Sequence, residues 1–137
     1  MKKVKVAVVG ATGAVGEEII DLLITRRFPF LEIVALASKR SAGKILKIKE
    51  HEFTVKEATP DAFEGIDIAF FCAGGSVSKA LAHEAVKKGA LVIDNTSAFR
   101  MEPDVPLVVP EVNPEDLKWH QGIIANPNCS TIIMLVA

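Results

Sequence analysis

The sequence predicts an α/β protein built on a doubly wound, mostly parallel sheet with helices on both faces, and three observations lead to this fold class. Short runs rich in valine, isoleucine and alanine lack regular polar alternation, as in strands that are covered on both faces. Segments with apolar residues at helical spacing separate these runs, and strands that alternate with helices form parallel sheets. Glycines gather where the first run meets the first helical segment.

The composition fits one domain over residues 1–137 and narrows the classes of partner. The net charge is −1 and half of the residues are hydrophobic, so no nucleic-acid partner is expected. No apolar run approaches the length of a membrane span and no apolar signal segment is seen, so no membrane partner is expected. Two cysteines are too few for a disulfide scaffold, which favours a reducing, cytoplasmic setting.

The first strand, turn and helix form one predicted unit. The strand covers residues 4–9, and apolar spacing predicts a helix from about Ala14 to Arg26. Between them, Gly10, Gly13 and Gly16 make a tight turn. Such a turn directs free backbone N–H groups and the positive end of the helix dipole at one spot, which suits the pyrophosphate of a nucleotide. The alternative is a turn that uses glycine only for its backbone freedom.

The second strand, at residues 32–37, ends in a basic turn. Ser38, Lys39, Arg40 and Ser41 stand where folds that prefer NAD usually place a carboxylate on the ribose 2′-hydroxyl. Cations and hydroxyls suit a 2′-phosphate, which a carboxylate would repel. The turn therefore favours NADP, the alternative being an ordinary solvated basic turn.

A third buried strand, at residues 67–72, ends beside a run of small residues. Ala73, Gly74 and the two residues that follow would let a ligand approach the backbone at the carboxyl end of this strand. The alternative is a plain glycine turn before the next helix. That helix is predicted from about Ser78 to Lys88, and it ends at Gly89.

Two loop-rich segments interrupt this pattern. Polar and apolar residues alternate in residues 44–58, which predicts a hairpin of two short strands on the edge of the sheet. Residues 59–63 are typical of a short helical turn that begins at a proline. Further along, residues 107–109 are expected to form a short strand, and a brief helix is expected within residues 111–119.

A fourth strand, at residues 90–94, leads into a polar segment that ends in Arg100. A guanidinium at this edge of the sheet suits a phosphate or a carboxylate, which it binds bidentately. The alternative is an ordinary surface arginine.

The last predicted strand, at residues 123–125, precedes the candidate nucleophile. Cys129 follows Asn128 and stands just before the apolar residues 132–136, which predict a buried helix. At a helix N-terminus the dipole and the free N–H groups favour a thiolate and lower the pKa of a cysteine. These groups, with the Asn128 amide, would also receive an oxyanion formed by attack on a carbonyl. The alternative is an inert buried cysteine.

Taken in order, these segments resemble the aspartate-semialdehyde dehydrogenase family over essentially the whole chain. The matching motifs are Gly10-Ala11-Thr12-Gly13-Ala14-Val15-Gly16, Ser38-Lys39-Arg40-Ser41-Ala42-Gly43, Ala73-Gly74-Gly75-Ser76, Asp94-Asn95-Thr96-Ser97-Ala98-Phe99-Arg100 and Asn126-Pro127-Asn128-Cys129-Ser130-Thr131. The resemblance implies that Cys129 forms a thioester and that Arg100 binds the phosphate. It also implies an NADP site that contains Thr12, Gly13, Ala14, Val15, Ser38, Arg40, Ser41, Ala73 and Gly74.

The reaction implied by this resemblance is the reduction of aspartyl phosphate to aspartate semialdehyde, a step of amino-acid biosynthesis towards lysine, threonine and methionine. In the family a second domain supplies a histidine acid/base, the residues that bind the substrate and most of a dimer contact, and none of these follows Ala137. We therefore expect a single cofactor domain that binds NADP and has little or no turnover, from a parent that forms homodimers or larger homo-oligomers.

Three alternatives are weighed against this family. N-acetyl-glutamyl-phosphate reductase shares the thioester chemistry, but it usually carries glycine before its cysteine, where this chain has Asn128. Glyceraldehyde-phosphate dehydrogenase prefers NAD and has a different cysteine signature. A non-catalytic nucleotide-binding module has the same fold but does not need a reactive cysteine.

Overall fold

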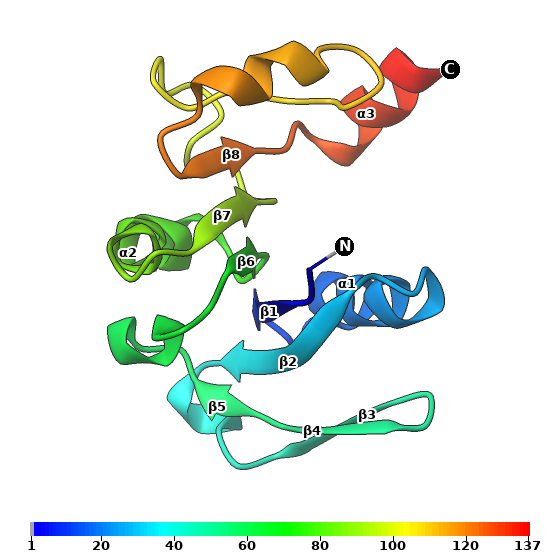
Figure 1. Ribbon diagram of the computed structural model, residues 1–137, viewed down its shortest axis with the longest axis vertical. Helices are drawn as coiled ribbons and strands as arrows, with labels where there is room; N and C mark the ends of the chain where they lie inside the picture. Colours follow the sequence, from blue (N-terminus) through cyan, green and yellow to red (C-terminus); the bar gives the residue numbers. More distant parts are fainter. Residues whose placement is uncertain (1) are drawn as a thin grey trace.

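The computed structural model describes residues 2–137 as a parallel sheet flanked by helices (Figure 1). The strands are β1 (Val4–Val9), β2 (Phe30–Ala37), β3 (Ile45–Ile48), β4 (His51–Thr54), β5 (Lys56–Glu57), β6 (Ile68–Phe71), β7 (Leu91–Asp94) and β8 (Ile123–Ala125). The α-helices are α1 (Ala14–Thr25), α2 (Gly75–Lys87) and α3 (Cys129–Val136), and the short 3-10 helices are η1 (Lys39–Ser41), η2 (Pro60–Phe63) and η3 (Pro114–Trp119).

Six strands form the main sheet in the order β5-β2-β1-β6-β7-β8, and every pair in it is parallel. From β1 the chain builds outward through β2 to one edge, and it then returns to β6 and builds towards the other edge. The sheet therefore changes direction between β1 and β6, and a ligand crevice is expected at the carboxyl ends of these strands. This arrangement confirms the predicted doubly wound fold.

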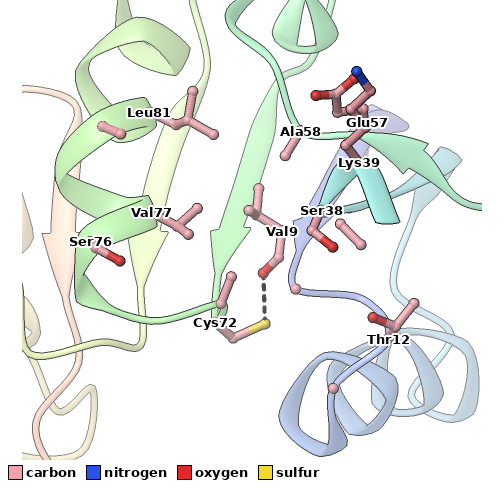
Figure 2. A pocket seen from close by; sticks show the side chains of 15 residues that line it. Val9, Thr12, Ser38, Lys39, Glu57, Ala58, Cys72, Ser76, Val77 and Leu81 are labelled. Atoms are coloured by element: carbon pink, nitrogen blue, oxygen red, sulfur yellow. Dashed lines mark hydrogen bonds between the residues drawn. The ribbon is translucent and has the colours of Figure 1, made fainter. Parts of the chain in front are cut away.

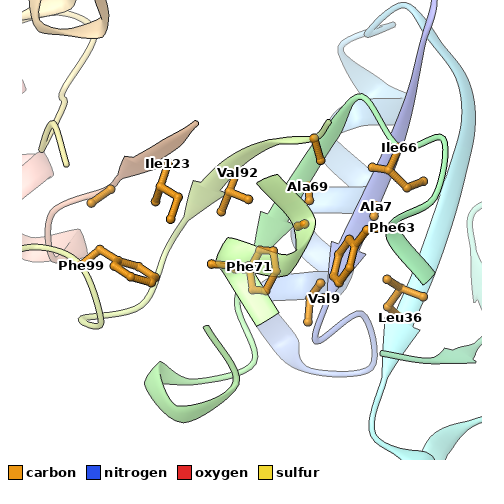
Figure 3. Close-up of a cluster of buried hydrophobic side chains, with 14 residues drawn as sticks. Ala7, Val9, Leu36, Phe63, Ile66, Ala69, Phe71, Val92, Phe99 and Ile123 are labelled. Carbon is orange, nitrogen blue, oxygen red and sulfur yellow. The ribbon is translucent and has the colours of Figure 1, made fainter. Parts of the chain in front are cut away.

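The residues of β1 divide the core between the two faces of the sheet. Val6 and Val8 point into a cluster under α1, and Ala7 and Val9 point into a second cluster under α2 and η2. Figure 1 shows α1 and α2 on opposite sides of the sheet, and Figure 3 shows the second cluster. The side chains of residues 6–9 are fully buried on both faces, which is why this part of β1 has no polar alternation.

The predicted hairpin exists, but its place on the edge of the main sheet was wrong. Strands β3 and β4 pair only with each other, and Ile48 and Phe53 pack with the cluster under α1. The edge position belongs to β5, which pairs in parallel with β2. The bonds from Val55 N to Lys44 O and from Gly43 N to Val55 O extend this pairing at the open end of the hairpin. The facing backbone groups of the two strands therefore pair with each other and not with the main sheet.

Several element limits also differ from the expected ones. Strand β2 begins at Phe30, and α2 begins at Gly75 rather than Ser78, because Gly74, with φ of 118°, turns the chain directly into the helix. Residues 107–109 are not a strand and form a single bridge, between Leu107 and Ala125. Prolines on both sides of this segment lack the N–H groups that a longer ladder requires.

Helix α3 has the predicted position, but the expectation that it is buried was wrong. Its apolar side chains remain largely exposed, with exposed fractions of 70% for Ile133 and 77% for Met134. No other element among residues 2–137 covers them. None of the helices in this part of the chain is both long and apolar enough to span a bilayer.

Candidate dinucleotide and cysteine site

The glycine turn after β1 brings three elements into close contact. Gly10 has φ of 91°, and a Cβ atom there would lie 2.9 Å from the backbone of Ala73. A Cβ atom on Gly16 would lie 2.1 Å from the carbonyl oxygen of Gly10. Only glycine allows both approaches, so the turn draws the start of α1 onto the ends of β1 and β6.

The start of α1 leaves backbone donors free. Its first intrahelical bond runs from Glu17 N to Gly13 O at 3.0 Å, and the amides of Ala14, Val15 and Gly16 have no backbone acceptor. Gly13 caps the helix without a side-chain hydrogen bond. Free amides at the positive end of a helix dipole form an anion site, as the glycine spacing predicted.

A cavity of about 660 Å³ opens beside this turn at the carboxyl ends of the strands. Its walls come from the ends of β1, β2, β5 and β6 and from the first turns of α2 (Figure 2). The lining residues are Val9, Gly10, Thr12, Gly13, Ala37, Ser38, Lys39, Glu57, Ala58, Cys72, Ala73, Ser76, Val77, Ala80 and Leu81. The wall on α2 is mostly apolar, whereas the ends of β2 and β5 contribute a hydroxyl, an ammonium and a carboxylate.

Five of the expected cofactor residues line this cavity, namely Gly10, Thr12, Gly13, Ser38 and Ala73. The other expected cofactor residues do not line it, although they adjoin the residues that do. Ala14, Val15 and Gly74 stand at helix starts next to the wall, and Arg40 is exposed within η1. Ser41 is buried, and its amide donates to Ser38 O at 2.9 Å, so it stabilises the backbone of the basic turn.

Sequence reasoning missed the residues that complete the cavity. Glu57 and Ala58 enter it because β5 pairs with β2, with Glu57 in register with Ala37. The sequence offers only a weak signal for β5, a short polar stretch after the hairpin. Two residues are too few to show the alternation that is typical of a strand. On α2, Val77 enters the wall because the helix begins at Gly75, and Leu81, one turn further along, lies on the same face.

Cys72 lies at the floor of the cavity. Its Sγ donates a hydrogen bond to the carbonyl oxygen of Val9 at 3.0 Å (Figure 2). Burial raises the pKa of the Cys72 thiol to about 11, and the nearby Asp94 carboxylate adds to this effect. Cys72 is therefore a protonated, weakly reactive thiol at neutral pH.

Asp94, at the end of β7, is fully buried and holds the following loop in place. Its Oδ1 accepts a hydrogen bond from Ser78 Oγ at 2.7 Å, and its Oδ2 accepts one from Thr96 Oγ1 at 2.9 Å. Thr96 Oγ1 in turn accepts from the amide of Ala98 at 3.2 Å. This network ties α2 to the loop that leads to Arg100.

Arg100 joins the loops that leave β7 and β8. Its Nε donates to Asn126 O at 2.7 Å, and its Nη2 contacts Asn95 O at 3.4 Å. A guanidinium has five N–H groups, so donors remain for an anion. The half-buried Arg100 thus lies against the segment that leads to Cys129.

Cys129 is the first residue of α3 and is exposed, which argues against the inert buried alternative. Asn128 caps the helix, since its Oδ1 accepts from Ser130 N at 2.9 Å. Neither residue lines the cavity, but β8 ends at the same edge of the sheet as β1 and β6, because all of these strands are parallel.

A doubly wound parallel sheet with a glycine turn, free helix N-terminal amides and a cavity at the strand ends defines a nucleotide-binding domain of the Rossmann class. Residues 5–120 match the family model described as "Semialdehyde dehydrogenase, NAD binding domain". The chain belongs to this family.

Known relatives agree with this assignment. The aspartate-semialdehyde dehydrogenase of Bacillus subtilis (strain 168) is 63% identical over 132 residues, which cover 96% of this chain and 38% of the relative. A crystal structure of aspartate semialdehyde dehydrogenase II from Vibrio cholerae, complexed with ASA, superposes with a TM-score of 0.93 at 47% identity, over 98% of this chain and 45% of that one.

A Candida albicans aspartate semialdehyde dehydrogenase structure with NADP has a TM-score of 0.80 at 32% identity, over 96% of this chain and 44% of that one. The present chain thus spans about 40% of the length of the curated relatives it matches.

Proposed function

We propose that this chain is the cofactor-binding and nucleophile-bearing part of an NADP-dependent aspartate-semialdehyde dehydrogenase. The observation that carries the proposal is the placement of the exposed Cys129 at the start of α3, on the sheet edge that also carries the dinucleotide cavity. Arg100, tied to Asn126, supplies a cation beside the segment that leads to this cysteine. The names of the relatives support the choice of substrate.

The cavity volume of about 660 Å³ lies in the usual range of cofactor sites, which supports a dinucleotide as its ligand. The free amides of Ala14, Val15 and Gly16 would hold the pyrophosphate, and any side chain at Gly10 or Gly16 would collide with backbone. Ser38, Lys39 and Arg40 would hold a 2′-phosphate, which supports NADP as the cofactor. Once bound, NADP would supply hydride exchange with the substrate.

In the oxidative direction, the Cys129 thiolate attacks the aldehyde carbon and forms a C–S bond. The resulting hemithioacetal alkoxide would give up its hydride to bound NADP and become a thioester. Phosphate held by Arg100 would then attack the thioester carbon. The C–S bond then breaks, releasing an acyl phosphate and the thiolate. The reverse sequence reduces aspartyl phosphate. N–H groups at the start of α3, with the Asn128 amide, stabilise the oxyanion in both directions.

Cysteine labelling tests the proposal. With iodoacetamide at pH 7.5, Cys129 should react at least tenfold faster than Cys72, and NADP should slow the reaction of Cys129. Cys129→Ser should abolish the fast phase and leave NADP binding intact. Slow and equal labelling of both thiols would instead favour a non-catalytic nucleotide-binding module.

A domain of this kind can bind its cofactor without catalysing turnover. We propose that the chain of 137 residues alone binds NADP and has little or no dehydrogenase activity, since it spans only part of its relatives. A steady-state rate close to that of a full-length relative would contradict this expectation.

A further inference from the structure

Glu57 places a carboxylate at one end of the cavity, although the neighbouring hydroxyl and ammonium groups suit an anion. Strand β5 pairs with β2 so that Glu57 is in register with Ala37, and Ser38 and Lys39 follow directly. The bond from Ala58 N to Ala37 O, at 2.8 Å, fixes the backbone beyond Glu57. Glu57 and Lys39 both line the cavity.

Neither of these two charges is neutralised by a neighbour. Within residues 2–137, the ion pairs join other side chains and include neither Lys39 nor Glu57. Figure 2 shows both side chains at the end of the cavity formed by β2 and β5. The end of the cavity formed by β2 and β5 therefore presents one free cation and one free anion to the same ligand.

We propose that Glu57 is a specificity-determining residue that limits how strongly this cavity prefers a ribose 2′-phosphate to a 2′-hydroxyl. The proposal rests on the function proposed above, because it assumes that a nicotinamide dinucleotide occupies the cavity. A 2′-phosphate brings close to two negative charges, which Lys39 attracts and Glu57 repels. A 2′-hydroxyl carries no charge, and a carboxylate accepts a hydrogen bond from it.

Each charge therefore acts mainly on one of the two cofactors. Removing the Glu57 charge favours NADP, and removing the Lys39 charge favours NAD. Both residues are exposed, so solvent moderates the effect and salt screens it. At low ionic strength we expect Glu57→Gln to tighten NADP binding by about threefold to tenfold, on the basis of Coulomb energies at a solvated surface.

The test is calorimetric titration of NADP and NAD into the full chain and four variants: Glu57→Gln, Lys39→Gln, the double variant and Glu52→Gln. Glu52 is an exposed carboxylate on β4, outside the cavity, and it controls for net charge. Glu57→Gln should raise the ratio of NADP affinity to NAD affinity, and 0.5 M NaCl should shrink this change. Lys39→Gln should lower the ratio, and Glu52→Gln should leave it within twofold of the wild type.

The possible failures are distinguishable. If the wild type binds both dinucleotides but Glu57→Gln leaves the ratio within twofold, the specificity role is overturned and the proposed function stands. If Glu57→Gln weakened the binding of NADP and NAD equally, Glu57 would contact a part that the two cofactors share. That result would also overturn the specificity role. If the wild type binds neither dinucleotide, the proposed function fails and this inference fails with it.

Discussion

Asp94 shows how a single buried residue supports the loops of the site. The carboxylate has no exposed surface, and its acceptors are satisfied by hydroxyl groups from α2 and from its own loop. Among the described residues, no buried side-chain oxygen or nitrogen lacks a hydrogen-bond partner. A buried carboxylate that loses a donor retains its desolvation cost, so this network is sensitive to small changes.

Ser78→Ala removes the 2.7 Å donor to Asp94 without creating a large void. We expect it to lower the free energy of unfolding by about 1–3 kcal/mol, because the buried Asp94 Oδ1 keeps only the longer contacts from Thr96 at 3.1 Å and 3.3 Å. Urea unfolding followed by circular dichroism measures the change. The matched control is Ser97→Ala, since Ser97 is exposed, and its effect should be below about 0.5 kcal/mol.

The Cys72 thiol should give a steep pH dependence of alkylation. Burial raises its pKa to about 11, so its labelling rate should climb about tenfold per pH unit between pH 7.5 and 10. Mass spectrometry of the Cys129→Ser variant isolates this reaction. A rate that levels off near pH 8 would contradict the raised pKa.

The same shift has a consequence for stability. The folded pKa lies above the unfolded value of 9.0, so the folded state keeps its proton longer. The contribution of the protonated Cys72 thiol to the free energy of unfolding is therefore fully present below pH 9, and it declines as the pH rises from about 9 to about 11. Cys72→Ala should remove this part of the alkaline decline in urea unfolding.

At the scale of elements, the packing of α1 against β1 depends on a missing side chain. Gly16→Ala would place a Cβ atom 2.1 Å from Gly10 O, so the helix must move away from the turn. We expect a loss of about 3 kcal/mol or more in the free energy of unfolding, because backbone cannot yield as a flexible side chain does. NADP affinity should fall as well, since the free amides of α1 move with the helix.

Gly13→Ala is the matched control for this change. Gly13 has φ of −88°, which any residue adopts, and its Cβ atom would lie 3.4 Å from Gly10 O. Stability should therefore remain within about 1 kcal/mol of the wild type. If both alanine variants were equally stable, the close approach at Gly16 would not be the constraint described here.

At the scale of the whole molecule, α3 leaves an apolar surface exposed. Ile133 and Met134 are 70% and 77% exposed, and Leu135 and Val136 adjoin them at 52% and 51%. A contiguous apolar surface of this kind favours association, whereas single exposed apolar residues do not.

The double variant Ile133→Lys, Met134→Lys should reduce the binding of a hydrophobic dye and any concentration-dependent association seen by sedimentation. The unfolding free energy should change by less than about 1 kcal/mol, because neither side chain belongs to a core cluster. Leu31→Lys is the control, since Leu31 is 63% exposed on β2, away from α3, and should leave dye binding nearly unchanged.

Much of the fold could be predicted because it depends on local patterns. The apolar run of β1 identified a strand buried on both faces, and Gly10, Gly13 and Gly16 identified the turn and the helix that follows. The exposed state of α3 could not be predicted from its apolar sequence, since burial depends on what packs against a helix. The edge position of β5 was missed for a similar reason, because two residues carry no periodicity.

The residues of the candidate site also fall into two groups: those that the local sequence identifies and those that only tertiary contacts bring together. By itself, the sequence determined the fold class, the glycine turn, the family resemblance and the position of Cys129 at a helix start, since each depends on residues close together in the chain. Only the tertiary structure decided that Glu57 joins Lys39 in one cavity, and that Arg100 binds the segment before Cys129. The physical reason is that strand pairing and loop contacts bring together residues that are distant in the chain. Local sequence patterns do not predict which of these distant loops will be in contact.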